Sequence, residues 1–186
     1  YHGNLEVWDK HLFEWICPGK SKRVGWEEWV KRLVEAVDIF GEGHVRSVFV
    51  CGVEMAQPYG FKTIEEAVKS TTEGIKLLMS HGVNPRFNVW SRESGAYLQK
   101  KYNQPPVTPE FYLQLMRNYY ENWKRYELPL PPRIHGSPDL SVIERCHNID
   151  DDLLRLMEQK DYENQALQAL EKVGTIWSYS MKDISV

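Results

Sequence analysis

A largely apolar run, Val45–Cys51, stops at Gly52 and is followed closely by Glu54. Its length and its content of Val and Phe favour a strand that is covered on both faces, as in a parallel sheet. The loop after such a strand is a common place for functional groups. Two similar stretches, at residues 1–7 and 84–90, predict further strands of the same kind.

Three other segments have the period of amphipathic helices. Apolar side chains recur at steps of three and four over residues 26–41, 63–82 and 108–126. Residues 17–25, by contrast, have the Pro, Gly, Ser and Lys content of a loop. Local end signals support the three helices: Gly41 as a C-cap, Thr63 with Glu66 as a capping box, Gly82 as a stop, and Thr108 with Pro109 as a start.

Strands and helices therefore alternate along the chain. This order predicts an α/β fold built from right-handed βαβ units around a parallel sheet. The helices begin roughly 35–45 positions apart, which is the spacing of βα units in a (β/α) barrel of the TIM type. We expect residues 1–132 to form part of such a barrel, and residues 133–186 to form a short strand and a helical C-terminal extension.

A barrel built from these units alone would be incomplete. Three or four βα units supply about half of the strands that a closed barrel needs. The remaining strand edges would be exposed, and soluble proteins avoid exposed edges. Because the chain begins at Tyr1, already within the first predicted strand, we expect the N-terminal half of the barrel to come from the same gene or from a separate chain.

Composition narrows the class of protein. The chain has 186 residues, 42% of them hydrophobic, and a formal net charge of -3, which fits one soluble domain with its own core. Basic residues are scattered, apart from the cluster Lys20, Lys22 and Arg23, so we expect no nucleic-acid partner. No apolar run has membrane-spanning length, and no leader sequence is evident. We expect a cytoplasmic protein with no membrane partner.

The cysteines predict no metal site. Cys17, Cys51 and Cys146 lie far apart and lack metal-binding spacing, as expected of reduced cytosolic thiols. Cys146 and His147 are adjacent, and together with His135 they still lack a fourth ligand for a metal ion.

The order of several short motifs resembles a known family. Residues 1–6 read Tyr-His-Gly-Asn-Leu-Glu, and Ser21-Lys22-Arg23 precede the helix that starts at Trp26. Residues 50–54 then read Val-Cys-Gly-Val-Glu. Together they are similar to the middle and rear of radical S-adenosylmethionine (SAM) enzymes of the biotin synthase and thiazole synthase type. The resemblance covers about residues 1–130 and implies the rear strands of a radical SAM barrel.

The resemblance implies cofactor-binding roles for three residues in the first part of the chain. Asn4 and Glu6 match the positions that hold the ribose hydroxyls of SAM, and side chains at i and i+2 leave one face of a strand together. Arg23 matches the position that receives the methionine carboxylate, which the planar guanidinium binds with two hydrogen bonds. The alternatives are a turn or cap residue for Asn4 and a solvated loop cation for Arg23.

Three further residues match the later strands of the family. Gly52 corresponds to a glycine that lets the backbone approach the adenine, and Glu54 stands one residue earlier than the family's glutamate. Asn88 corresponds to a position near the cofactor on the next strand. A buried structural asparagine is the alternative for Asn88.

The family's cluster-binding cysteine triad does not occur in this sequence. The resemblance therefore implies a [4Fe-4S] cluster only with a missing N-terminal segment. Without the cluster, reductive cleavage of SAM lacks its electron source, so we expect no activity from this chain alone. The sequence identifies neither the catalytic residues nor the small-molecule substrate. A non-catalytic α/β partner or scaffold subunit that retained the fold is the alternative.

Overall fold

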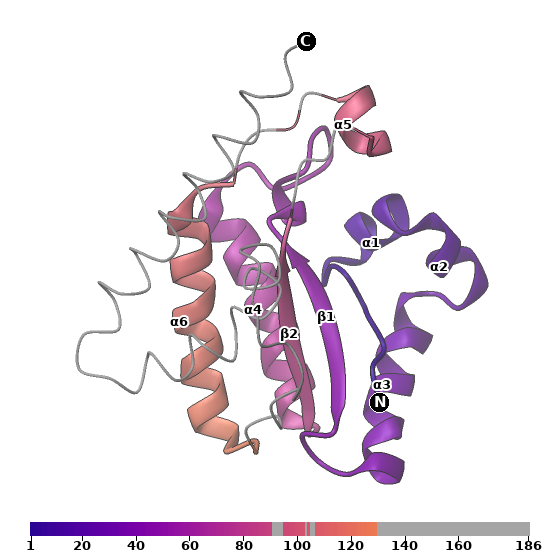
Figure 1. Ribbon diagram of the computed structural model, residues 1–186, viewed down its shortest axis with the longest axis vertical. Helices are drawn as coiled ribbons and strands as arrows, with labels where there is room; N and C mark the ends of the chain where they lie inside the picture. Colours follow the sequence, from indigo (N-terminus) through magenta and orange to yellow (C-terminus); the bar gives the residue numbers. More distant parts are fainter. Residues whose placement is uncertain (91–94, 103, 105–106, 130–186) are drawn as a thin grey trace, which may run out of the picture.

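The computed structural model describes residues 1–90, 95–102, 104 and 107–129. These residues form a mixed α/β arrangement around a short parallel sheet (Figure 1). Strand β1, Val45–Cys51, pairs with β2, Val83–Val89, and the register places Val45 opposite Val83 and Cys51 opposite Val89. Helix α4, Ile64–Ser80, is the crossover that a parallel connection requires.

The first six residues run beside the other edge of β1. Two isolated parallel bridges join them to it, His2 with Arg46 and Glu6 with Phe49. The segment advances from residue 2 to residue 6 while β1 advances from 46 to 49, so the segment contains one extra residue and forms a bulge. At the bulge the Leu5 N–H donates to the Ser47 Oγ at 3.1 Å. The strand expected at 1–7 is thus an extended, parallel but bulged segment.

The longer helices confirm the end signals in the sequence. Helix α3, Trp26–Phe40, ends at Gly41, whose φ of 89° is one that glycine tolerates. Helix α4 begins with the expected capping box of Thr63 and Glu66. Helix α6, Pro109–Tyr126, has Thr108 as its N-cap residue, although the Thr108 side chain forms no capping hydrogen bond.

The expected loop at 17–25 is wrong. Helix α2, Pro18–Arg23, occupies most of this range. Pro18 is tolerated at the first helical position because the N–H of that position has no partner within a helix, so its absence in proline costs nothing. The preceding helix α1, Lys10–Ile16, was not expected, and the Asp9 carboxylate caps it by accepting from the Leu12 N–H at 2.9 Å. Two more short helices follow the strands: η1, Val53–Met55, and α5, Tyr97–Lys101.

One face of the sheet packs against the long helices. Phe49 of β1 and Phe87 of β2 lie 6.0 Å apart between ring centroids, and Tyr119 of α6 meets Phe87 edge-on at 5.2 Å. Leu5 and Val7 extend this core from the bulged segment, and both are fully buried. Register partners in a parallel sheet share a face, so the alternate positions, among them Arg46, Val48 and Asn88, belong to the opposite face.

The predicted barrel and the domain boundary at 132/133 extend past the described residues. The predicted short strand and helices of 133–186 lie outside them, as do Cys146 and the two histidines considered with it. The described part supplies three parallel segments; in Figure 1, α4 and α6 lie to their left and α1, α2 and α3 to their right.

Candidate functional site

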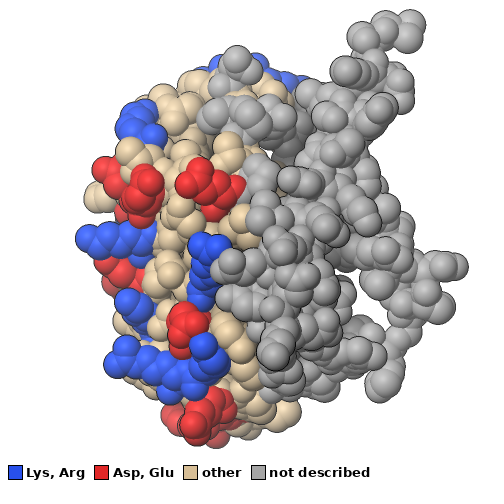
Figure 2. Space-filling model, turned by 90° about the vertical axis from the view of Figure 1, so that its left-hand side faces the viewer, with Lys and Arg blue, Asp and Glu red and all other residues tan. Residues whose placement is uncertain are grey.

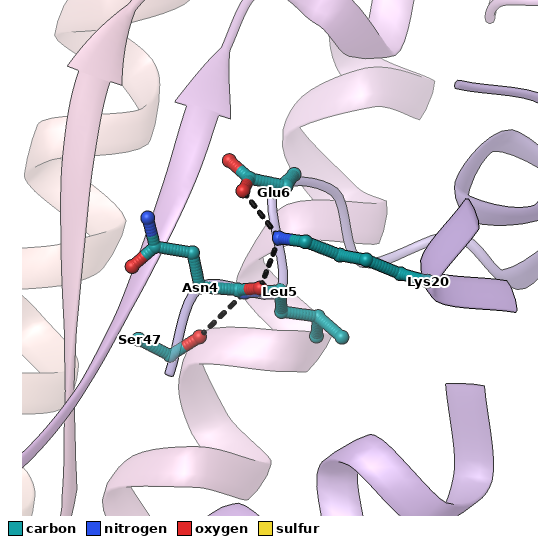
Figure 3. A network of polar contacts seen from close by, with 5 residues as sticks. All are labelled: Asn4, Leu5, Glu6, Lys20 and Ser47. Atoms are coloured by element: carbon teal, nitrogen blue, oxygen red, sulfur yellow. Dashed lines mark hydrogen bonds and ion pairs between the residues drawn. The ribbon is translucent and has the colours of Figure 1, made fainter. Parts of the chain in front are cut away.

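Asn4 and Glu6 meet a lysine at the bulge (Figure 3). The Lys20 Nζ donates to the Glu6 Oε1 at 2.5 Å and to the Asn4 backbone oxygen at 2.7 Å. It also lies 5.0 Å from the ring centroid of Trp29. The Lys20 and Glu6 side chains keep 30% and 22% of their surface exposed, so the ion pair is accessible from solvent.

The bulge sets the direction of the Glu6 side chain. Glu6 has a φ of 73°, in the left-handed region, which costs a non-glycine residue about 1–2 kcal/mol. Backbone bonds on both sides hold it there: the Glu6 N–H donates to the Val48 oxygen at 2.9 Å, and the Val50 N–H donates to the Glu6 oxygen at 2.7 Å. Non-glycine residues held at such angles are concentrated at functional sites.

The polar groups at the bulge are suited to a ligand with hydroxyl groups. Within the described residues the Asn4 side-chain amide forms no hydrogen bond, and the second oxygen of Glu6 has no partner. Figure 3 shows both side chains leaving the segment toward the same side, while Lys20 reaches in from the other. A carboxylate oxygen and an amide on one side can bind two neighbouring hydroxyls together.

A polar strip continues from this site across the sheet. His2 is bridged to Arg46, and Asn88 is half-buried opposite Val50 in the register. Burial lowers the pKa of His2, and the nearby positive charges of Arg46 and Arg86 lower it further. Asn88 lies on the face of the sheet opposite to that of Phe49 and Phe87, and its contact with the cofactor stays a prediction.

Arg23 lies apart from this group. It is the last residue of α2 and its side chain is exposed to solvent. Lys20, one helical turn earlier, is the cation that reaches Glu6. Sequence reasoning included Lys20 only in a basic cluster, because the spacing of three residues has meaning only once α2 is known to be a helix. The carboxylate-binding role of Arg23 stays a prediction.

Gly52 and Glu54 are enclosed within the chain. Gly52 has a φ of 104°, and a Cβ there would lie 2.6 Å from the Val107 Cγ2 and 3.1 Å from the Tyr112 hydroxyl. Glu54 is fully buried; one carboxylate oxygen accepts from the Gly52 N–H and the other from the Thr71 hydroxyl, each at 2.6 Å. These contacts give both residues a structural role. The approach of Gly52 to the adenine and the cofactor-binding role of Glu54 stay predictions.

The thiols provide no metal centre in the described part of the chain. Burial raises the pKa of Cys17 to about 11, with a further rise from the Glu6 carboxylate, so the thiol is protonated at neutral pH. Cys51 is buried in β1. Among the described residues, no group of three or more His, Cys, Asp or Glu side chains could hold a metal ion.

The outer side of the helices has an open groove of about 700 Å³ between α4 and α6. Acidic and basic residues both line it, including Glu65, Lys69, Glu73 and Arg125. Figure 2 shows the two signs interspersed over the part of this face that is drawn in colour. A surface of mixed sign lacks the basic stripe of a nucleic-acid site. In the described residues, no helix is both long and apolar enough to span a bilayer.

Comparison with known proteins gives one informative similarity. The chain is 27% identical over 132 residues to bacteriochlorophyllide c C-7(1)-hydroxylase of Chlorobaculum limnaeum. The match covers 68% of this chain and 29% of the length of that enzyme. No protein-family model matches the chain, and no solved structure matches it.

Proposed function

We propose that this chain is the rear part of a radical SAM enzyme and that it binds the cofactor ribose through Asn4 and Glu6. The observation that carries the proposal is the bulge, which directs an amide and a carboxylate to one side of a parallel segment (Figure 3). Glu6 pairs with β1 near its carboxyl end, where ligands of parallel α/β folds bind.

The similarity to a bacteriochlorophyllide hydroxylase supports a relation to radical SAM enzymes. The chain spans 29% of that enzyme's length, so the reaction and its partners belong to the proposal. According to this proposal, the three parallel segments belong to a (β/α) barrel whose N-terminal half carries the cluster-binding cysteines. The substrate is of the relative's kind, a wide, flat and largely apolar ring system.

The residues present fit the ribose of SAM better than its other parts. The Asn4 amide and the Glu6 carboxylate can bind two neighbouring hydroxyls, and Lys20 holds the Glu6 carboxylate in place. Asn88 and the polar face of β2 would border the rest of the cofactor. When bound, SAM and the [4Fe-4S] cluster supply the radical chemistry. The chain itself binds and orients the cofactor and encloses it on one side.

A second function has two observations in its favour. Glu6 already has a partner in Lys20, and Gly52 is packed against Val107. A subunit that retained the fold but no longer binds SAM would show the same contacts. It would act as a non-catalytic partner or scaffold.

Calorimetric titration with SAM tests the proposal in the full-length protein, reconstituted anaerobically with iron and sulfide. We expect Glu6→Ala to weaken SAM binding by about 1–3 kcal/mol, because the ribose hydroxyls lose their acceptor. Glu14→Ala is the matched control, since Glu14 is an exposed carboxylate on the nearby helix α1. Equal SAM affinity in both variants would remove the ribose assignment and favour the scaffold subunit.

A further inference from the structure

Three aromatic side chains meet at one end of the sheet. Trp15 of α1 lies 5.1 Å from Tyr59 and 6.3 Å from Tyr102 between ring centroids. Both tyrosines are turned across the tryptophan, at interplanar angles of 87° and 60°. We call Trp15, Tyr59 and Tyr102 the aromatic cluster. It presents ring faces and ring edges together, the two surfaces with which aromatic groups pack on one another.

The aromatic cluster lies where parallel folds bind ligands. Trp15 follows the bulged segment, Tyr59 follows β1, and Tyr102 follows β2 with α5 between them. Each residue thus comes from the connection after the carboxyl end of a different parallel segment. Figure 1 shows α1, the connection after β1 and α5 gathered around the upper end of the sheet. Substrates of such folds bind outside the carboxyl ends of the strands.

A buried glutamine fixes two of the connections to each other. The Gln57 N–H donates to the Gln104 Oε1 at 2.8 Å, and the Gln104 Nε2 donates to the Gln57 oxygen at 2.9 Å. Gln104 is only 2% exposed, and both bonds are partly buried. Tyr59 follows Gln57 by two residues and Tyr102 precedes Gln104 by two. The cluster is therefore held together before any ligand binds, which lowers the entropy cost of binding.

The cluster is nevertheless open to solvent and has a cation at its rim. Tyr59 keeps 67% of its surface exposed. Lys101 Nζ lies 5.2 Å from the Tyr102 ring centroid and donates to the Tyr97 hydroxyl at 2.8 Å. A large aromatic surface held rigidly in water beside an ammonium group suits a flat apolar ligand that carries a carboxylate.

We propose that the aromatic cluster binds the flat ring of the substrate and that Lys101 pairs with a carboxylate on that ring. This inference rests on the proposed function, which makes the substrate a wide apolar ring system. The inference assigns the aromatic cluster as the surface that binds the ring. It also assigns Lys101 as the charged group that orients the ring.

Equilibrium dialysis of the full-length protein against pheophorbide a tests this site. Pheophorbide a is a flat, metal-free macrocycle with one free carboxylate, and its methyl ester lacks that charge. We expect Tyr59→Ala to weaken pheophorbide binding about tenfold or more, in the range of an interface aromatic anchor. Phe40→Ala is the matched control, because Phe40 is a half-exposed ring, stacked on Tyr1 at 5.4 Å, near the opposite end of β1. It should bind as the unaltered protein does.

The charge is tested by Lys101→Gln. We expect this variant to bind the acid several-fold more weakly and the methyl ester with unchanged affinity. Equal losses for acid and ester would overturn the assignment of Lys101. Equal affinities of Tyr59→Ala and Phe40→Ala for pheophorbide would overturn the cluster as the ring site.

SAM titration of the same preparations separates this inference from the proposed function. If Glu6→Ala weakens SAM binding but Tyr59→Ala leaves the affinity for pheophorbide unchanged, only the ring site is overturned. Pheophorbide binding that depends on Tyr59, without any effect of Glu6 on SAM, supports the ring site and overturns the ribose assignment alone. The absence of both dependences overturns both.

Discussion

The buried carboxylate of Glu54 couples folding to pH. Burial raises its pKa to about 6, although the hydrogen bonds from Thr71 and the Gly52 backbone act in the opposite direction. In an unfolded chain a glutamate has a pKa of about 4.3. The folded state therefore binds the proton more tightly. The stabilisation from protonation is fully present below the unfolded pKa and is lost as the pH rises through about 6.

We expect Glu54→Gln to remove this dependence. A difference of one to two pKa units corresponds to about 2 kcal/mol, so the free energy of unfolding of the variant, relative to the unaltered chain, should rise by about that amount between pH 4 and pH 7.5. Urea unfolding at several pH values measures it. Taking the difference between the two proteins cancels the exposed carboxylates that they share. A difference that stays constant with pH, or falls, would contradict the burial of a titrating carboxylate.

At the scale of single residues, the sequence identifies candidate residues better than it predicts the contacts of their side chains. The family resemblance singled out Asn4 and Glu6, whose i, i+2 spacing is typical of one strand face, and Figure 3 shows both side chains on the same side of the bulged segment. The burial of Glu54 could not be predicted, because its partner Thr71 lies 17 residues away on α4. A carboxylate directly after a strand is equally compatible with a binding site and with a buried group that accepts hydrogen bonds from within the chain.

At the scale of elements, helix α4 packs against the first segment through a glycine. A Cβ on Gly74 would lie 2.5 Å from the ring of Trp8, which is itself fixed edge-on to Trp26. Trp26 also donates from its Nε1 to the Trp8 backbone oxygen at 2.7 Å. The tryptophan therefore has little freedom to move away from an added methyl group.

We expect Gly74→Ala to destabilise the protein by about 1–3 kcal/mol, because overpacking outweighs the helix propensity gained by alanine. Gly19→Ala in α2 is the control. No atom lies within 4 Å of a Cβ there, so it should leave the stability unchanged or slightly raised. Thermal unfolding of the two variants measures the contrast. Equal stabilities would show that α4 does not rest on Trp8.

Long elements were predictable and short ones were not. The capping box of α4 and the terminal glycine of α3 are local signals, so they could be recognised without the fold. Helices α1, α2 and α5 have 7, 6 and 5 residues, too few for a periodic pattern to develop. Contacts with distant parts of the chain, such as that of Lys20 with Glu6, contribute to their placement.

For the whole molecule, the described sheet is open at both edges. Within the described residues, the bulged segment and β2 each pair with β1 on one side only. If a barrel is completed by other βα units, the 186-residue chain expressed alone should self-associate or aggregate through these edges. Sedimentation velocity over a range of concentrations measures this. A monodisperse monomer that unfolds in one sharp transition would count against the incomplete barrel.

The alternation of strands and helices predicted parallel pairing, and β1 and β2 do pair in parallel with a helical crossover. The number of units that close a barrel is a different matter. The number of strands in a barrel, and whether the barrel closes, depend on contacts across the whole fold. The sequences of three segments do not determine how many further strands pair with them.

The bonds from Gln104 to Gln57 also bear on how this protein could evolve. Both involve the backbone of Gln57 and neither involves its side chain. A connection that is held through its peptide groups keeps its position when its side chains change. Tyr59, which is 67% exposed, could then be replaced by a residue suited to another compound without loss of the anchor. Divergence of substrate preference within such a lineage would require few compensating changes elsewhere in the chain.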